Sequence, residues 1–231
     1  MQLAQIKSTL VFGDIHGTTY WKKAVADNPD CRYIFLGDYL DPYTDVPREE
    51  LICNLNEIIQ LKKDRNDDVV LLLGNHDLHY FCRDVPGTSG RFDYQISEVA
   101  REIFTENLSL FTYSVQEGNR IFTHAGISES WFLNEFKGDL NKNIAEQFNN
   151  PQMPREQLRA LHQAGEARGG SWCSIGGIFW ADISELNDPL SGYTQYVGHN
   201  RTGKIREVEK NDGKIIFCDC IYNEIYLKLD S

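Results

Sequence analysis

Long apolar runs, paired cysteine motifs and a surplus of positive charge are all missing from this 231-residue sequence. No stretch approaches the roughly 18 uninterrupted apolar residues that a membrane-spanning helix requires, and residues 1–14 lack the pattern of a signal peptide. The six cysteines are scattered without CxxC spacing, which favours reduced thiols. We therefore expect a cytoplasmic protein without a membrane partner.

The charge balance is acidic, since 23 Lys and Arg residues stand against 34 Asp and Glu residues for a net charge of −11. Such a balance argues against a broad nucleic-acid interface and against binding to anionic membranes. The net charge does not exclude binding of acidic ligands, because bound metal ions supply positive charge that this total omits. At roughly 150 residues per domain, and without repeats or linkers, residues 1–231 are expected to form a single domain of undecided oligomeric state.

Three short apolar runs in the first third each end in glycine followed by a polar residue, at 9–12, 33–36 and 69–73. Continuous apolar runs of this length are typical of strands buried on both faces. Apolar residues recur at helical spacing over 51–59, just after Pro47, and again over 96–104. Strands alternating with helices predict a parallel sheet that helices cover.

The second half changes character towards a mixed sheet. Alternating apolar residues at 111–115 and a run at 121–124 predict strands, and a run at 195–198 predicts another. An Asn-Asp-Gly turn at 211–213 predicts a hairpin of 204–209 with 214–218, and a last strand is expected over 222–229. We expect helices at about 130–150 and from Pro154 to about 168, and a loop over 165–177. Together these elements predict an α/β sandwich of two mixed β-sheets flanked by helices.

Polar segments follow five of the strand-like runs, and they hold most of the histidines of the chain. Because ligand sites in open α/β sheets lie beyond the carboxyl ends of strands, we expect these segments to converge on one rim. They are Gly13-Asp14-Ile15-His16-Gly17, Gly37-Asp38-Tyr39-Leu40-Asp41, Gly74-Asn75-His76-Asp77, Thr123-His124-Ala125-Gly126 and Gly198-His199-Asn200.

The residue types in these segments are those of a metal centre. Asp, His and Asn supply oxygen and imidazole donors, and no cysteine belongs to the set. That composition suits Mn²⁺, Fe or Zn²⁺ and disfavours a closed structural zinc site. Two ions roughly 3.5–4 Å apart need a bridging group, and the order of the segments along the chain makes Asp38 the natural bridge.

Together the segments resemble the signature of the calcineurin-like metallophosphoesterases, and most of all that of the serine/threonine protein phosphatase-type branch. This branch also includes bacterial diadenosine tetraphosphate hydrolases. Gly-Asp-x-His-Gly and Gly-Asn-His-Asp carry the resemblance, and 179–182 and 217–219 are similar to later family segments. The resemblance implies two divalent metal ions and, by motif, a ligand set divided between them. Asp14 and His16 would bind the first metal, Asp38 would bridge, and Asn75, His124 and His199 would bind the second. His76 would be the general acid near the leaving oxygen, and Asp41 would orient it.

One departure from the family concerns its phosphate-gripping arginines. The branch follows its second Asp with an Arg, whereas Asp41 is followed here by Pro42, which has no backbone donor. A second family Arg lies between the last two His ligands, and Arg168 is our candidate for it. Arg201 is a second candidate, and Arg83 and Arg91 stay open.

The sequence therefore predicts a metal-dependent phosphoesterase that hydrolyses a phosphate monoester by attack of a metal-bridging hydroxide. Mn²⁺ is the preferred ion, and the substrate is expected to be a phosphoprotein, a nucleotide or a small phosphate ester. A protein serine/threonine phosphatase is one form of this hypothesis. A diadenosine polyphosphate or other nucleotide hydrolase is the alternative, and a catalytically silent scaffold of the same fold is the alternative of another class. Tyr43, Trp172 and Trp180 either line the cleft or pack in the core, and His162 is expected to be exposed.

Overall fold

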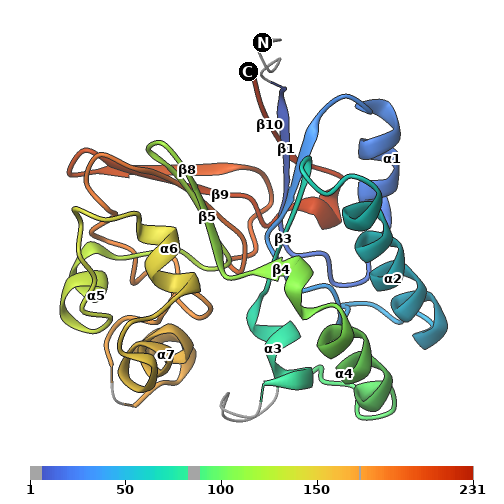
Figure 1. Cartoon of the computed structure of the whole chain (residues 1–231), viewed down its shortest axis with the longest axis horizontal. Coiled ribbons are helices and arrows are strands. Elements are labelled where there is room, and N and C mark those ends of the chain that lie inside the picture. Colours follow the sequence, from blue (N-terminus) through green and yellow to red (C-terminus); the bar gives the residue numbers. More distant parts are fainter. Residues whose placement is uncertain (1–6, 83–88, 172, 231) are drawn as a thin grey trace.

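The computed structural model describes residues 7–82, 89–171 and 173–230, and within them the chain forms two five-stranded sheets (Figure 1). The first sheet has the order β10-β1-β2-β3-β4, with β10 antiparallel to β1 and the other neighbours parallel. Its strands are β1 Thr9–Phe12, β2 Arg32–Phe35, β3 Val69–Leu72, β4 Phe111–Thr112 and β10 Leu227–Leu229.

The second sheet has the order β5-β6-β7-β9-β8, with a parallel centre and an antiparallel strand at each edge. Its strands are β5 Ser114–Glu117, β6 Arg120–Thr123, β7 Thr194–Val197, β8 Arg206–Lys210 and β9 Gly213–Phe217. Both sheets are therefore mixed, as the sequence predicts.

Helices lie outside the two sheets (Figure 1). Those beside the first sheet are α1 Tyr20–Asp27, α2 Arg48–Asp64, α3 Asn75–Phe81 and α4 Ser97–Glu106. Those beside the second sheet are α5 Glu129–Asn134, α6 Ile144–Asn149 and α7 Pro154–His162. Short 3₁₀ turns occur at Leu108–Leu110, Glu166–Arg168 and Ile221–Asn223. Among the described residues, no helix has both the length and the apolarity needed to cross a bilayer.

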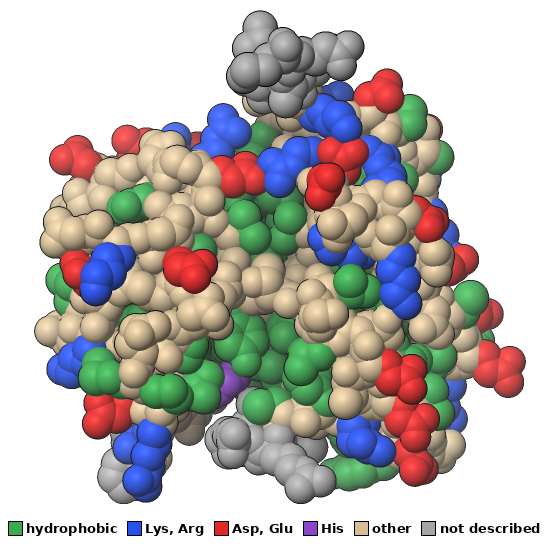
Figure 2. Space-filling view, viewed as in Figure 1, with side chains coloured by type: hydrophobic (Ala, Val, Ile, Leu, Met, Phe, Trp, Pro, Cys, Tyr) green, Lys and Arg blue, Asp and Glu red, His purple; other side chains and the backbone are tan. Residues whose placement is uncertain are grey.

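The interior has two layers because the central strands are covered on both faces. Val11 and Ile34 of the first sheet share a buried cluster with Phe122 and Tyr196 of the second, so the two sheets pack face to face. The alternate residues of β1 and β2, among them Phe12, point into the cluster between the first sheet and its helices. This double coverage explains why the strand segments are continuously apolar. On the face that Figure 2 shows, acidic and basic side chains are interspersed over the surface.

Several expectations about the second half are wrong: the helix from Pro154 ends at His162 rather than near 168, and of the last strand expected over 222–229 only Leu227–Leu229 forms. The helix expected over 130–150 is two helices, because a new N-cap forms at Asn143, whose side chain accepts a hydrogen bond from the Glu146 N–H at 2.8 Å. Before it, Lys137 adopts a left-handed φ of 58° that ends the preceding turn. His162 is buried rather than exposed, since its ring stacks on Phe179 with centroids 5.1 Å apart. The hairpin is confirmed, with Asn211 and Asp212 in the left-handed region that its two-residue turn requires.

Candidate metal centre

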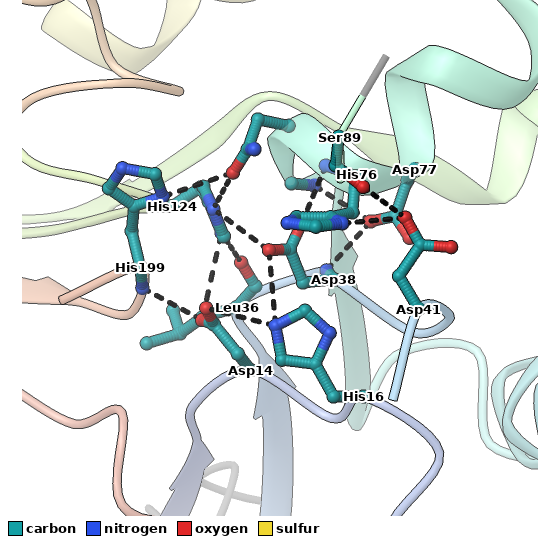
Figure 3. Close-up of polar contacts among 12 residues, drawn as sticks. Asp14, His16, Leu36, Asp38, Asp41, His76, Asp77, Ser89, His124 and His199 are labelled. Atoms are coloured by element: carbon teal, nitrogen blue, oxygen red, sulfur yellow. Dashed lines mark hydrogen bonds and ion pairs between the residues drawn. The ribbon is translucent and has the colours of Figure 1, made fainter. Parts of the chain in front are cut away.

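The loops that leave the strand ends meet at one edge of the sandwich, as Figure 3 shows. The His16 N–H donates to the Asp38 carbonyl at 2.7 Å, which joins the loops after β1 and β2. The His199 N–H donates to Oδ1 of Asp14 at 2.8 Å, which joins the loop after β7 of the second sheet to the first. The expected convergence of the five segments is therefore confirmed for the described chain.

Glycine is required where the second and third loops approach each other. A Cβ atom at Gly74 would lie 2.2 Å from Oδ1 of Asp38, so only glycine lets this carboxylate sit against the backbone. His16, Asp38, Asp41 and His199 all have left-handed φ angles between 41° and 59°. Such conformations cost free energy in non-glycine residues and cluster at functional sites. The loops are thus shaped to aim these side chains inwards.

Asp77 connects the same two loops, a role for which the sequence analysis made no prediction. Its fully buried carboxylate accepts hydrogen bonds from the N–H groups of Asp38, Tyr39 and Gly74 at 2.8, 2.9 and 2.8 Å. The available signal was its place as the last residue of Gly-Asn-His-Asp, three positions after the residue that caps α3. Asp77 is therefore a structural link that holds Asp38 beside α3.

A first group of donors surrounds His16. Its Nδ1–H donates to the Leu40 carbonyl at 2.7 Å, which leaves the lone pair on Nε2 facing inwards. That Nε2 atom lies 3.8 Å from Oδ2 of Asp14 and 3.6 Å from Oδ2 of Asp38. Burial lowers the pKa of His16 to about 4 despite the nearby Asp38 charge, so the imidazole is neutral at pH 7. A neutral nitrogen donor and two carboxylates around one point suit a cation.

A second group of donors surrounds Asn75. The His124 Nδ1–H donates to the Leu36 carbonyl at 2.8 Å, so the unprotonated Nε2 of His124 faces Oδ1 of Asn75 at 2.9 Å. Nδ1 of His199 lies 3.0 Å from the same oxygen. Burial lowers the pKa of both histidines. The acceptor atoms of His124 and Asn75 thus face each other with no proton between them, an arrangement that a cation would stabilise.

Asp38 lies between the two groups. Its Oδ2 atom is 3.6 Å from Nε2 of His16 and also 3.6 Å from Nε2 of His124. Burial and the neighbouring Asp219 and Asp38 charges raise the pKa of Asp14 well above its ordinary value. Burial and Asp38 raise the pKa of Asp219 to about 7. Asp14 and Asp219 are thus costly to ionise beside Asp38, and a bound cation would reduce that cost.

His76 and Asp41 form a pair beside the first group of donors. Nδ1 of His76 lies 2.6 Å from Oδ2 of Asp41. Asp41 also accepts hydrogen bonds from the Tyr80 hydroxyl and, at 2.9 Å, from the Ser89 hydroxyl, so its carboxylate is held firmly. The ring centroid of His76 lies 5.0 Å from that of His16. A histidine oriented in this way is suited to proton transfer at the edge of the centre.

Three of the candidate arginines lie around the centre, and each has different partners. Nη2 of Arg168 donates to Oδ1 of Asn200, the residue after His199, at 3.0 Å. Nε of Arg168 forms an ion pair with Oδ2 of Asp182 at 2.9 Å. Arg201 stacks between the rings of Tyr43 and Tyr222, at 4.3 and 3.7 Å from their centroids.

Arg91 contacts one of the site histidines directly, with Nη2 3.3 Å from Nε2 of His76. The fourth candidate, Arg83, lies outside the described residues.

Aromatic side chains form the rim. The Tyr43 ring lies 4.8 Å from that of His16 and is 44% exposed, so Tyr43 lines the site. The Trp180 ring lies 6.0 Å from that of His199. Trp180 and Arg168 also border a cavity of about 720 Å³ that α7 helps to line. Trp172 lies outside the described residues.

Comparisons with known proteins identify the family and show the same fold. Residues 7–192 match the family model described as calcineurin-like phosphoesterase. A cold-active protein-tyrosine phosphatase of the psychrophile Shewanella sp. is similar in structure, with a TM-score of 0.59 and 14% identity over 98% of this chain and 81% of that one. A protein serine/threonine phosphatase from Saccharomyces cerevisiae, with similarity to human phosphatase PP5, has a TM-score of 0.53 and 14% identity over 94% of this chain and 69% of that one. At these identities the two likenesses concern the fold.

Proposed function

We propose that this chain, which belongs to the calcineurin-like phosphoesterase family, hydrolyses phosphate monoesters at a dinuclear metal centre. The observation that carries the proposal is the position of Asp38, whose Oδ2 atom lies 3.6 Å from the inward nitrogen of one histidine in each donor group. One carboxylate placed between two sets of donors is suited to bridge two ions.

The first ion would be held by Asp14, His16 and Asp38, and the second by Asp38, Asn75, His124 and His199. Nitrogen and oxygen donors without cysteine favour Mn²⁺, with Fe or Zn²⁺ as alternatives. When bound, such ions polarise the phosphoryl oxygens and make a hydroxide nucleophile available near neutral pH. Leu40 and Leu36 contribute through their carbonyls, which fix the tautomers of His16 and His124 and keep the ligating nitrogens unprotonated.

His76 would donate a proton to the leaving oxygen. Its Nδ1–H is directed to Asp41, so the proton that it can give up lies on Nε2, on the side of the first donor group. Asp41 favours the protonated imidazole and fixes its orientation, as a general acid requires. Arg168 would bind phosphoryl oxygens from the opposite side, beside His199. Arg201 stays a candidate for the same role from the rim.

The substrate is a phosphorylated molecule, and we propose a phosphoprotein carrying phosphoserine or phosphothreonine. A dinucleoside polyphosphate is the second candidate, since Pro42 stands where the protein phosphatase branch has an arginine. A silent scaffold is disfavoured because both donor groups and the His76–Asp41 pair are assembled.

The test is turnover of p-nitrophenyl phosphate with and without added Mn²⁺, followed by a phosphoserine peptide and diadenosine tetraphosphate. We expect metal-dependent turnover of p-nitrophenyl phosphate that a chelator abolishes, and a higher kcat/KM on the peptide. Preference for the dinucleotide would select the second candidate. No turnover of any of the three by protein that contains metal would select the scaffold.

A further inference from the structure

A guanidinium group occupies the space beside Asp41, although the residue that follows Asp41 is Pro42. It belongs to Arg91, whose Nε–H donates to the Asp41 carbonyl at 3.0 Å. The Arg91 N–H in turn donates to the hydroxyl of Ser89, which itself donates to the Asp41 carboxylate. The loop that carries Arg91 is therefore attached to Asp41 at both its backbone and its side chain.

The free end of this guanidinium points into the site. Nη2 of Arg91 lies 3.3 Å from Nε2 of His76 and 3.5 Å from Nε2 of His16. These are the nitrogen that would give up the proton and the nitrogen that would bind the first metal. Arg91 therefore faces the space between the proposed general acid and the first donor group.

Neither contact is a close hydrogen bond, because 3.3 and 3.5 Å both exceed the usual range of about 2.7–3.2 Å between donor and acceptor. The lone pair of His16 Nε2 would in addition be used if that atom ligates a metal ion. The Nη2–H groups then need another acceptor, and an arginine always retains its charge. A phosphoryl oxygen supplies an anionic acceptor of matching geometry.

We infer that Arg91 binds a phosphoryl oxygen of the substrate, from a different segment of the chain than the missing arginine after Asp41. The inference rests on the proposed function, because it assigns a residue to the phosphate of that same reaction. Arg91 and Arg168 would then contact the phosphate from two sides, through the His76 side and the His199 side respectively.

Tyr43 fixes the direction in which Arg91 points. The Arg91 guanidinium lies over the Tyr43 ring, 3.7 Å from the ring centroid. The Arg201 guanidinium lies 4.3 Å from the same centroid. Stacking of this kind is attractive because the ring face carries partial negative charge, and it restricts the orientation of the guanidinium. Because the carbonyl of Asp41 and the ring of Tyr43 both hold the group, little side-chain entropy is lost when it binds an anion. Tyr43 is thus a positioning residue.

The test measures binding of inorganic phosphate to the Mn²⁺-loaded protein by titration calorimetry, with metal content determined by mass spectrometry. Arg91→Ala should weaken phosphate binding by about 10- to 100-fold, the range for loss of a hydrogen bond to a charged group, and should retain its metal. The matched control is Arg120→Ala. Arg120 is exposed at the start of β6, at the opposite end of the strand from His124, and this variant should bind phosphate like the wild type.

Tyr43 provides a separate readout. Tyr43→Ala should weaken phosphate affinity several-fold, and Tyr43→Phe, which keeps the ring under the guanidinium, should weaken it less. If Arg91→Ala loses metal or unfolds, phosphate affinity and metal content are measured for Arg91→Gln instead. This variant keeps an amide donor for Asp41 and should show the same weaker binding of phosphate.

Wild-type phosphate affinity in a metal-loaded Arg91 variant would overturn the inference while leaving the proposed function intact. A wild-type protein that neither binds phosphate nor hydrolyses esters would instead overturn the proposed function.

Discussion

The Nδ1 atom of His76 lies 2.6 Å from Oδ2 of Asp41, and both side chains are buried beside the candidate metal centre. Burial disfavours the charged imidazole, but the Asp38 and Asp41 carboxylates outweigh it and raise the pKa of His76 above 6.5. In the proposed mechanism the protonated form donates, so the pKa of this residue would set the alkaline limit of the reaction.

We therefore expect kcat for an alkyl phosphate to fall as the pH rises through the His76 pKa. Asp41→Asn removes the charge that favours the imidazolium, so the falling limb should move to lower pH. Rate profiles of both proteins from acidic to alkaline pH check this, with p-nitrophenyl phosphate as the substrate that depends less on the acid. Identical limbs in the two proteins would contradict the pairing.

Removal of His76 should separate proton donation from metal binding. His76→Asn should retain both metals, because the neighbouring Asn75 is the proposed ligand. The loss should be about 10²–10⁴-fold on a phosphoserine peptide, whose alkoxide leaving group needs the proton, and clearly smaller on p-nitrophenyl phosphate. Kinetics on both substrates and metal content decide the matter. Equal losses, or loss of a metal ion, would show that His76 is not the general acid.

Asp38→Asn should impair the centre most completely. A neutral amide bridges two cations poorly, and Asp38 is the residue that faces His16 and His124 alike. Metal content should drop below the wild-type level and hydrolysis should be abolished. The matched comparison is Asp67→Asn, an exposed carboxylate after α2, which should behave like the wild type. Full metal content with full activity in Asp38→Asn would remove the bridge assignment.

Arg168→Ala should slow turnover without loss of metal. By analogy with loss of one oxyanion donor, we expect a decrease of about 10²–10³-fold in kcat. Steady-state kinetics with metal analysis measure this, and Arg101→Ala on the exposed side of α4 controls for loss of a positive charge. Wild-type rates in the Arg168 variant would leave Arg91 or Arg201 as the phosphate-binding arginine.

Asp77→Ala should destabilise the protein although Asp77 is not a proposed ligand. It leaves three buried N–H groups without their acceptor, and each unsatisfied group costs roughly 1–3 kcal/mol. The free energy of unfolding of the metal-free protein should therefore fall by about 3 kcal/mol or more in urea denaturation. Asp77→Asn, which retains one acceptor oxygen, should lose less. A loss under about 1 kcal/mol in Asp77→Ala would show that water replaces the carboxylate.

Much of the site was readable from local sequence because its signals are local. Apolar runs that end in Gly-Asp or Gly-Asn specify buried strands and the sharp turns that follow them, and parallel pairing brings such turns to one edge. The Asn211–Gly213 turn predicts its hairpin for a similar reason, since neighbouring residues decide the backbone conformation.

Tertiary structure alone decided where the long side chains meet. Nothing near Pro42 in the sequence indicates that a residue 50 positions after Asp41 supplies the guanidinium beside it. The burial of His162 against Phe179 is of the same kind. Periodicity and turn chemistry act between neighbours along the chain, whereas such contacts depend on which faces the packed sheets and loops bring together. The sequence by itself therefore determined the strands, the turns and the kinds of polar side chain that gather at the strand ends, and only packing decided which arginine faces the centre.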